Sequence, residues 1–424
     1  MHTLIVGSGG REHALGWRLV QDNPMHSLFF LPGNGGTHRL GRNLPGPLNY
    51  PRIREAVELF DIGMVVFGPE APLVEGWAER LRHDFGEHLA VVGPDREGAR
   101  LEGSKAFAKN FMRRHGIPTA EYRTFGRSEH RELIDYLKRS AYPLVLKASG
   151  LAAGKGVVIC QNTTEAFEAV ERFFVQHQFG QAGHQVIVEH FLDGQECSVF
   201  IVTDGHTYRY LPSARDYKRA YDADQGPNTG GMGAFTPVPY ISNAIEGKIR
   251  TQIIERTLDG LQQNGIAFRG FLFFGLMIVD GNPYVLEYNI RLGDPETQVI
   301  LPMTEGPFAE VLEGVARGRL SETGQLSFRR GAQLAVIAAA EGYPISYEKG
   351  YSIQGIEDAE SVPHVTVFHA GTHLADNGTM YTAGGRVLAV SAHGHDLSQA
   401  RSRAYQAIEK IRFQGMFYRR DIGR

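Results

Sequence analysis

The sequence predicts a multidomain protein of the α/β and α+β classes. With 424 residues, the chain exceeds one ordinary domain and suggests about three. Its first third alternates short apolar strands with helical stretches, its middle holds a glycine-rich loop between two strands, and its last part combines strands with an amphipathic helix. Alternating strands and helices indicate a parallel sheet, whereas the last pattern indicates a separate α+β unit.

Composition and charge narrow the class of protein. A hydrophobic share of 42% with 21% charged residues is typical of a soluble globular protein. The 44 Lys and Arg residues face 47 Asp and Glu, and a net charge of -3 gives no electrostatic basis for binding nucleic acid or an anionic membrane. The longest strongly apolar run, residues 271–279, is about half a bilayer span, and residues 1–10 resemble a strand and turn rather than a signal peptide. We therefore expect no membrane association.

The two cysteines, Cys160 and Cys197, lie in apolar strand-like runs. By themselves they form neither a disulfide framework nor a zinc site, so we expect both in the core. Such low cysteine usage suits a reducing cytoplasm.

A glycine-rich turn follows the first predicted strand. Residues 3–6 are apolar, residues 7–13 read GSGGREH, and a helical stretch comes next. Backbone amides at such a helix N-terminus approach an anion closely, and Arg11 adds a cation beside Gly10. Glu12 stands where the dinucleotide-binding fingerprint has its third glycine, so that match is partial. The turn therefore either binds phosphate or serves chain geometry alone.

The same third of the chain predicts a parallel sheet. Further strands are expected at residues 27–32, 64–67 and 89–92, with helical stretches at residues 53–59 and 76–82. In such a sheet the loops at the carboxyl ends of the strands form a crevice, in which we expect a small ligand to bind.

A second glycine-rich loop lies in the middle of the chain. The apolar residues 143–149 lead into GLAAGKG at residues 150–156, and the apolar residues 157–160 follow. A Walker loop needs one more residue between its glycines, Ser or Thr after the lysine, and then a helix. Strands on both sides instead predict a hairpin flap over phosphates, with Lys147 and Lys155 as its cations. The alternative is a glycine-rich hairpin that binds nothing.

Segments on either side of this flap carry weaker signals. Residues 101–115 predict one helix, and residues 185–192 predict a strand whose end suits hydrogen bonds to an adenine edge. Glu196 follows a turn and suits ribose hydroxyls. The glycine-rich and polar residues 213–219 and 225–234 predict a long loop at a site, with a flexible surface linker as the alternative.

The stretch of residues 285–296 divides its side chains between two faces, because successive side chains of a strand point in opposite directions. One face is apolar, and the other holds a carboxylate, an amide and a guanidinium. Oxygen ligands of this kind suit magnesium, and the arginine fork suits phosphate. The alternative is an amphipathic strand whose polar face is only solvated. The apolar set is Leu286, Tyr288, Ile290 and Leu292, and the polar set is Glu287, Asn289 and Arg291.

Residues 271–279 are the expected hairpin partner of this stretch, through a turn at residues 280–283. We expect the strand to be central in its sheet, so that its charges need partners. Farther along, residues 332–340 and 384–390 predict strands of the C-terminal unit. A helix is expected to follow them, with core positions at Leu397, Ala400, Ala404, Ala407, Ile408 and Ile411.

Together these motifs resemble those of the phosphoribosylamine–glycine ligases, or glycinamide ribonucleotide synthetases, which are ATP-grasp enzymes of purine biosynthesis. The resemblance runs essentially end to end. Its main departures are Ser149, where Asp is expected, and Ile290 and Leu292, where Cys or Ala and Phe are more usual. The matching motifs are residues 9–14, 68–73, 101–105, 150–157, 226–234 and 291–298.

The resemblance implies a fold of three parts. A pre-ATP-grasp α/β domain is expected at residues 1–103 and a split ATP-grasp pair at residues 104–328, with the flap-bearing subdomain at about residues 119–193. A small C-terminal α+β domain is expected at residues 329–424. The family's chemistry implies ligation of glycine to 5-phospho-D-ribosylamine through glycyl phosphate, giving N1-(5-phospho-D-ribosyl)glycinamide, ADP and phosphate. This is an early step of de novo purine (IMP) biosynthesis, and it implies ATP with Mg²⁺ or Mn²⁺ and a monomer or weak homo-oligomer.

The resemblance also implies roles for individual residues. Metal ligation falls to Glu287 and Asn289, and ATP binding to Lys105, Lys147, Gly154, Lys155, Gly156, Glu189, Leu192 and Glu196. Substrate binding falls to Gly10, Arg11, Asn34, Glu70, Asn228, Thr229 and Gly230. Catalytic roles fall to Arg291, Asp216, Lys218 and Asp294, although Asp294 alternatively only caps a turn.

Three competing functions remain open on the sequence. A nicotinamide dehydrogenase would use the first glycine turn but leaves the flap and the Glu287 face unexplained. A non-catalytic nucleotide sensor would keep the adenosine pocket and tolerate the loss of Arg291. Another ATP-grasp ligase or carboxylase would differ mainly in the acceptor chosen by residues 216–233.

Overall fold

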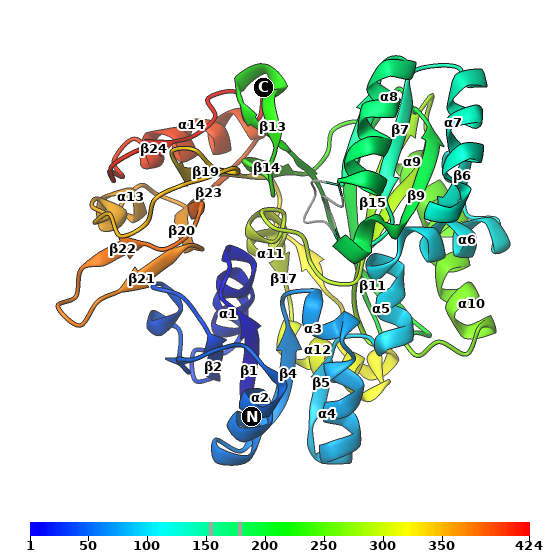
Figure 1. The fold of residues 1–424 in the computed structure, drawn as a ribbon. Coiled ribbons are helices and arrows are strands. Elements are labelled where there is room, and N and C mark those ends of the chain that lie inside the picture. Colours follow the sequence, from blue (N-terminus) through cyan, green and yellow to red (C-terminus); the bar gives the residue numbers. More distant parts are fainter. Residues whose placement is uncertain (152–155, 177–179) are drawn as a thin grey trace.

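The computed structural model describes residues 1–151, 156–176 and 180–424 (Figure 1). The N-terminal sheet is formed by β1 (His2–Gly7), β2 (Ser27–Pro32), β3 (Arg42–Asn43), β4 (Ile62–Phe67) and β5 (Ala90–Val92). All its pairs are parallel, in the order β3-β2-β1-β4-β5, which confirms the predicted parallel sheet. The chain leaves β1 first to one side and later to the other, so the strand order reverses between β1 and β4. The carboxyl ends of these two strands are where a ligand crevice is expected in such a sheet.

The helices of this part include one difference from prediction. Residues 101–115 belong to two helices, because Ser104 adopts an extended conformation and caps the second with its hydroxyl, which accepts from the backbone N–H of Phe107 at 3.2 Å. The break places Lys105 at the first position of α6. The helices are α1 (Gly10–Asp22), α2 (Tyr50–Leu59), α3 (Ala71–Val74), α4 (Trp77–Phe85), α5 (Arg96–Gly103) and α6 (Lys105–Arg114).

The flap-bearing subdomain has its own antiparallel sheet, in the order β6-β9-β7-β8. Its elements are β6 (Tyr122–Gly126), α7 (His130–Arg139), β7 (Leu144–Ala148), β8 (Val157–Cys160), α8 (Thr163–Val170) and β9 (Gln185–His190). Lys147 pairs with Val157, so the predicted hairpin is confirmed. Its tip residues Gly154 and Lys155 lie outside the described residues.

A nine-stranded sheet crosses the rest of the molecule in the order β16-β15-β10-β11-β14-β19-β23-β20, with β24 beside β19. It joins the middle of the chain to its C-terminal part, across the domain boundary expected at residue 329. Its strands are β10 (Gln195–Thr203), β11 (Tyr208–Asp216), β14 (Gly233–Thr236), β15 (Gly270–Val279), β16 (Asn282–Asn289), β19 (Ala332–Ala340), β20 (Val365–His369), β23 (Arg386–Gly394) and β24 (Met416–Phe417).

The hairpin of β15 and β16 is confirmed, with a turn in which Asp280 and Gly281 have φ values of 47° and 70°. The expectation that β16 is central is wrong, because it ends the sheet, and its outer edge meets Thr119 in a parallel bridge. Partners for its charges therefore come from other parts of the fold.

The long loop expected between residues 213 and 234 is more ordered than predicted. Strand β11 continues to Asp216, and β12 (Arg219–Tyr221) pairs with β13 (Gln225–Asn228) as a hairpin. The expectation of a loop was wrong for these residues, because backbone pairing orders them despite their glycine-rich composition.

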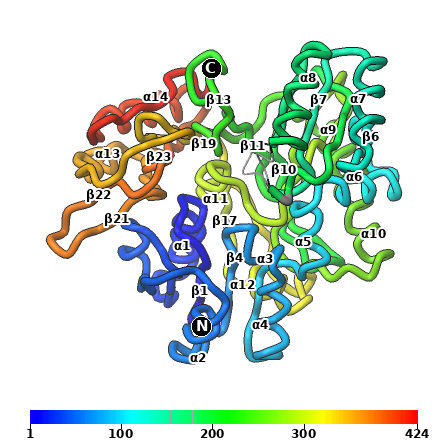
Figure 2. The backbone as a smooth tube through the Cα atoms, in the orientation of Figure 1, coloured from blue at the N-terminus to red at the C-terminus, as the bar shows by residue number. Residues whose placement is uncertain are grey.

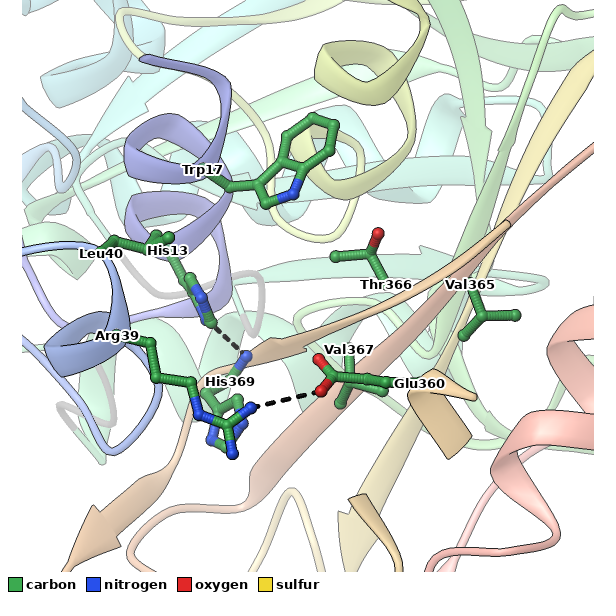
Figure 3. A pocket seen from close by; sticks show the side chains of 9 residues that line it. All are labelled: His13, Trp17, Arg39, Leu40, Glu360, Val365, Thr366, Val367 and His369. Atoms are coloured by element: carbon green, nitrogen blue, oxygen red, sulfur yellow. Dashed lines mark hydrogen bonds and ion pairs between the residues drawn. The ribbon is translucent and has the colours of Figure 1, made fainter. Parts of the chain in front are cut away.

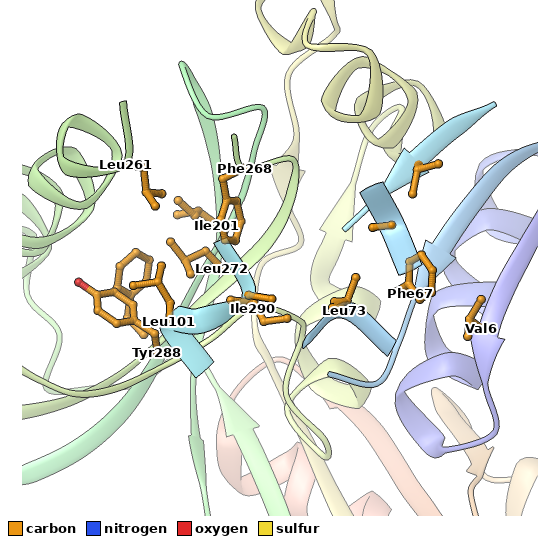
Figure 4. Close-up of a cluster of buried hydrophobic side chains, with 14 of the residues drawn as sticks. Val6, Phe67, Leu73, Leu101, Ile201, Leu261, Phe268, Leu272, Tyr288 and Ile290 are labelled. Atoms are coloured by element: carbon orange, nitrogen blue, oxygen red, sulfur yellow. The ribbon is translucent and has the colours of Figure 1, made fainter. Parts of the chain in front are cut away.

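The apolar residues form continuous cores across these units. Side chains of the N-terminal sheet, of α5 and of the β15–β16 hairpin share one cluster, in which Phe67, Leu101, Leu272 and Tyr288 are prominent (Figure 4). Both Cys160 and Cys197 are buried, as expected.

The C-terminal helix α14 (Leu397–Ile408) confirms four of the predicted core positions, since Ala400, Ala404, Ala407 and Ile408 are fully buried. Leu397 is only half-buried, and Ile411 is buried but lies beyond the end of the helix. The remaining elements are α9 (Asn243–Ile249), α10 (Glu255–Gln263), α11 (Thr297–Met303), β17 (Thr304–Glu305), α12 (Phe308–Arg317), β18 (Ser327–Phe328), α13 (Ile356–Glu360), β21 (Thr372–Leu374) and β22 (Met380–Thr382).

Helix α11 lies in the middle of the molecule (Figure 2), where it contacts α1 on one side and β11 and β19 on the other. The segment that carries the predicted chemistry leads directly into this helix. Within the described ranges, no helix combines the length and apolar character needed to cross a membrane.

Candidate active site

The site is organised around the end of β16. Glu287 lies opposite Gly275 of β15, which lies opposite Ser198 of β10, so these three residues share one face of the sheet. On the other face, Tyr288 is buried against Phe274, as predicted.

One detail of the predicted alternation fails. A β-bulge between Gly275 and Leu276 shifts the register, so Val285 is fully buried while Leu286 is only half-buried. The polar face from Glu287 onward is unaffected by this shift.

Arg291 is held by residues from three separate segments. Its guanidinium lies 2.7 Å from Glu102 Oε1 and 3.4 Å from Glu70 Oε2, and it donates to Asn289 Oδ1 at 3.0 Å. Burial works against its charged form, but Glu102 and Glu70 raise the pKa of Arg291 above its usual value. The guanidinium is therefore a fixed cation at the end of β16.

Glu102 is a site residue to which the sequence analysis gave no role. It is 8% exposed at the end of α5, and its Oε2 accepts from the backbone N–H of Ile290 at 2.8 Å. This single carboxylate therefore fixes both the backbone and the guanidinium of the chemistry-bearing segment. Its position in the motif of residues 101–105 was the only available signal.

Two lysines, the predicted ATP-binding residue Lys147 and the unassigned Lys109, converge on Glu189. Lys147 Nζ lies 3.0 Å and Lys109 Nζ 2.9 Å from Glu189 Oε2, and all three side chains are buried. Burial lowers the pKa of Lys109 to about 8. The other oxygen, Oε1, is buried without a hydrogen-bond partner among the described residues. Lys109 was not assigned from sequence, although it lies one helical turn after Lys105.

Ser149 anchors the base of the flap. Its Oγ accepts from the N–H of Ala106 at 3.1 Å, and its carbonyl accepts from the N–H of Lys105 at 2.7 Å. The serine thus ties the flap to the first turn of α6, while Lys105 Nζ donates to the carbonyl of Gly150 at 3.2 Å. At the other side of the hairpin, the carbonyl of Gly156 accepts from the N–H of Ala148 at 2.8 Å.

The remaining predicted nucleotide residues follow β9. Leu192 is half-buried just after the strand, and Glu196 at the start of β10 pairs with Lys218 at 2.7 Å. Desolvation opposes the charged form of Lys218, but Asp216 and Glu196 raise its pKa well above the usual value. Burial raises the pKa of Asp216 despite the nearby Lys218. Lys218 is therefore a cation flanked by carboxylates at the end of β11.

The glycine turn after β1 closes around Glu12. This carboxylate accepts from the N–H of Gly9 and from Arg11 Nε at 2.6 Å, and an added Cβ at Gly68 would lie 1.9 Å from its Oε1. Glycine at position 68 is therefore required for space at the crevice between β1 and β4. Arg11 also donates to the carbonyl of Leu292 at 3.1 Å, which joins this turn to the end of β16.

Two other predicted substrate residues define the same crevice. The Asn34 amide donates to the carbonyls of Ser8 and His369 and accepts from two backbone N–H groups, so it shapes the turn from within. Gly10 packs against Gln298, since an added Cβ would lie 2.4 Å from its Nε2.

Asp294 faces the C-terminal part of the molecule. Its Oδ2 lies 3.3 Å from Arg386 Nη2, and its Oδ1 accepts from Gln298 Nε2 at 2.8 Å. Burial alone would raise its pKa, but Arg386 and Arg11 hold that pKa below the usual range. Asp294 is therefore an ionised carboxylate held between Arg386 and Gln298.

Arg386, which sequence reasoning missed, also joins the β12–β13 hairpin to the site. It donates to the carbonyl of Gly230 at 2.6 Å, and the N–H of Gly230 donates to the Tyr343 hydroxyl at 2.9 Å. The N–H of Thr229 donates to the carbonyl of Lys218 at 2.7 Å, and Asn228 pairs with Arg219 in the hairpin. In the sequence, Arg386 follows a glycine turn at the start of a predicted strand, and this context does not indicate a role in the site.

The oxygen atoms of Glu287 and Asn289 fit a magnesium ion. Burial opposes ionisation of Glu287, but Lys218, Lys105 and Lys147 hold its pKa below the usual value. Among the described residues, Asn289 Oδ1 accepts from Arg291 Nη2 at 3.0 Å, and an amide oxygen has two lone pairs, so one remains for a cation. The described residues contain no group of three or more His, Cys, Asp or Glu side chains able to hold a metal. Magnesium characteristically binds through one or two side chains plus substrate phosphates, which suits this pair.

A separate cavity of about 240 Å³ lies between α1 and β20 (Figure 3). His13 accepts there from the N–H of His369 at 2.8 Å, and burial lowers the pKa of His13 to about 3. None of the predicted site residues is among its lining residues.

The fold and site together define the ATP-grasp class. The biotin carboxylase domain of 2-oxoglutarate carboxylase from Hydrogenobacter thermophilus superposes with a TM-score of 0.74 over 98% of this chain and 91% of that chain. At 17% identity this likeness concerns the fold alone.

More specific matches cover nearly the whole chain. Residues 1–102, 103–297 and 333–424 match the N domain, the ATP-grasp (A) domain and the C domain of phosphoribosylglycinamide synthetase. The chain therefore belongs to the phosphoribosylglycinamide synthetase family.

Individual relatives match along their full lengths. A phosphoribosylamine–glycine ligase of Clostridium acetobutylicum is 42% identical over 427 residues, covering 100% of both chains. The crystal structure of phosphoribosylamine–glycine ligase from Thermotoga maritima has 38% identity and a TM-score of 0.86, again over 100% of both chains.

Proposed function

We propose that this protein ligates glycine to 5-phospho-D-ribosylamine with ATP, giving N1-(5-phospho-D-ribosyl)glycinamide, ADP and phosphate in purine biosynthesis. The observation that carries the proposal is the position of Glu287, whose ionised carboxylate lies in the field of Lys105, Lys147 and Lys218. A carboxylate and converging cations beside Asn289 and Arg291 are the groups that phosphoryl transfer requires.

The nucleotide is assigned to the space between the flap-bearing sheet and β16. Lys105 and Lys147, with Gly154, Lys155 and Gly156 of the flap, would hold the phosphates. The unpartnered Oε1 of Glu189 suits the amino group of adenine. Leu192 and Glu196 would complete the adenosine site.

Glu287 and Asn289 are the residues that would hold Mg²⁺ or Mn²⁺. A bound ion would offset the negative charge of the ATP phosphates. The protein's own contribution is the Arg291 guanidinium, which Glu102 and Glu70 fix where charge develops on the transferring phosphoryl or acyl group.

The acceptor substrates are assigned to the crevice between the three parts of the chain. Gly10, Arg11, Asn34 and Glu70 would surround the ribose phosphate, with Asp294 facing the same space. The Asp216–Lys218 pair and the hairpin residues Asn228, Thr229 and Gly230 would hold glycine or the ribosylamine. ATP converts the glycine carboxylate into an acyl phosphate, because a carboxylate itself offers no adequate leaving group to an amine.

The omission experiment tests the proposal. Purified protein is incubated with ATP, MgCl₂, glycine and ribosylamine generated in situ, and each component is left out in turn. We expect ADP and the glycinamide product to form only in the complete mixture, at a rate that falls when the metal is chelated. ADP release that is indifferent to glycine would refute the ligase assignment, and hydride transfer to a nicotinamide would favour a dehydrogenase. We place the reaction in the cytoplasm, which the low cysteine usage supports.

A further inference from the structure

A buried carboxylate at the start of α11 has no role in the site as described so far. Glu296 is 4% exposed, and its Oε1 accepts from Ser198 Oγ of β10 at 3.2 Å. Its other oxygen lies over Gly293, where an added Cβ would come within 2.4 Å of Oε2. The carboxylate is therefore held by two elements, and residue 293 must be glycine to leave space for it.

This carboxylate faces the same surface as Glu287. The cross-strand row Glu287, Gly275, Ser198 and Ala214 places four residues on one face of β16, β15, β10 and β11. Between Glu287 at one end and the Ser198–Glu296 contact, the only intervening residue is Gly275, which has no side chain. Substrate atoms above this row would lie between Glu287 and Glu296.

The second half of the ligation requires a proton acceptor. When the amine nitrogen attacks the carbonyl carbon of the acyl phosphate, a C–N bond forms, and the C–O bond to phosphate breaks with its electron pair leaving on phosphate. The nitrogen then carries one proton too many. The departing phosphate is released as HPO₄²⁻, so a base close to the nitrogen accepts this proton first and then passes it to the phosphate oxygen on which the electron pair was left.

We propose that Glu296 is the base that accepts this proton from the attacking amine of the ribosylamine. The proposal rests on the ligase function proposed above. Ser198 is then a positioning residue, because its hydroxyl holds the Glu296 carboxylate. The two carboxylates have different roles: Glu287 faces the metal, and Glu296 accepts the proton.

The electrostatic surroundings support these different roles for Glu287 and Glu296. Burial and the neighbouring carboxylate of Asp216 raise the pKa of Glu296 to about 7, although Arg291 and Lys218 act in the opposite direction. A general base is most effective when its pKa lies near the working pH. Glu287, by contrast, is held ionised by lysines.

The test separates the two half-reactions. Glu296→Gln is assayed with hydroxylamine, a strong nucleophile that traps the acyl phosphate as the hydroxamate, and then with ribosylamine. We expect hydroxamate formation within about threefold of the unmodified protein and ribosylamine transfer reduced by about 10²–10⁴-fold. Glu305→Gln, at a half-exposed position after the same helix, is the matched control and should leave both rates unchanged.

Two further readouts complete the test. In the unmodified protein, the kcat/KM for ribosylamine should increase as the pH rises through about 7, because Glu296 becomes ionised. Glu296→Gln should not show this increase. Glu296→Asp, which keeps a carboxylate, should recover part of the transfer rate. Unchanged ribosylamine transfer in Glu296→Gln, or equal loss of both half-reactions, would overturn the assignment. Failure of the unmodified protein to form the hydroxamate would instead count against the proposed ligase function.

Discussion

Glu102 and Arg291 lie 189 positions apart in the sequence, yet Oε1 of the first is 2.7 Å from Nη2 of the second. The same carboxylate also binds the backbone N–H of Ile290. A residue at the end of α5 thus holds both the main chain and the guanidinium of the segment that follows β16. This contact connects the N-terminal part of the chain to the centre of the site.

The first prediction concerns this contact. Glu102→Gln keeps the shape of the side chain but removes the charge that compensates Arg291, so we expect a loss of about 2 kcal/mol in the free energy of unfolding. Turnover should fall because the guanidinium is less well fixed. Denaturant unfolding and steady-state rates measure the two effects.

Glu97→Gln provides the control for that variant. Glu97 lies on the same helix but is exposed and pairs with Arg100 at the surface, so its loss should change neither stability nor rate measurably. Equal behaviour of the two variants would show that the buried contact has no special role.

The second prediction concerns metal binding. Glu287→Ala removes the carboxylate assigned to magnesium, and we expect glycine-dependent ADP formation to fall by at least about 10²-fold. Glu287→Gln should regain little activity but should shift the Mg²⁺ dependence to higher concentration. Glu255→Ala, at an exposed position on α10, is the control. Near-normal turnover of Glu287→Ala would rule out the metal assignment.

The third prediction concerns the anchor of the flap. Ser149→Ala leaves the N–H of Ala106 without its acceptor at a buried position, which should cost about 1 kcal/mol of stability. Because this contact positions Lys105, we also expect a higher KM for ATP. Ser149→Asp, the residue expected in the family, should restore the acceptor and the KM.

Thermal unfolding and initial rates at varied ATP measure these effects. The exposed Ser128 of the same subdomain supplies the matched variant Ser128→Ala, which should behave like the unmodified protein. An unchanged KM in Ser149→Ala would mean that the flap is held by other contacts.

The fourth prediction concerns the crevice between β1 and β4. Gly68→Ala would bring a methyl group within 1.9 Å of Glu12 Oε1, so the carboxylate must move away from the glycine turn. We expect a loss of about 1–3 kcal/mol in stability and a clear rise in the KM for ribosylamine.

Gly247→Ala is the control for this substitution. An added Cβ at Gly247 of α9 meets nothing within 4 Å, so alanine should be neutral or slightly stabilising there. If Gly68→Ala were equally harmless, the Glu12 carboxylate would move aside more easily than its contacts indicate.

The sequence alone predicted many of the strands and the class of chemistry. Strand periodicity placed Glu287 and Asn289 on one face of β16, because side chains of a strand alternate whatever their neighbours are. The strand ends at Asn289, so Arg291 reaches the site from the segment that follows rather than through the predicted strand. Strand-like runs on both sides of the glycine-rich loop likewise predicted the flap hairpin, which the pairing of Lys147 with Val157 confirms. These inferences depend on short segments, whose geometry is set mainly by the residues within them.

Only the tertiary structure decided how these segments meet. The placement of β16 at the edge of its sheet depends on contacts between distant residues. The break at Ser104 and the pairing of β12 with β13 are local features that the sequence analysis missed. Contacts between distant residues also determine the roles of Glu102, Arg386 and Glu296, which are ordinary charged residues in sequence. They gain their roles because folding buries them beside opposite or like charges, and the energy of such contacts depends on distance and burial.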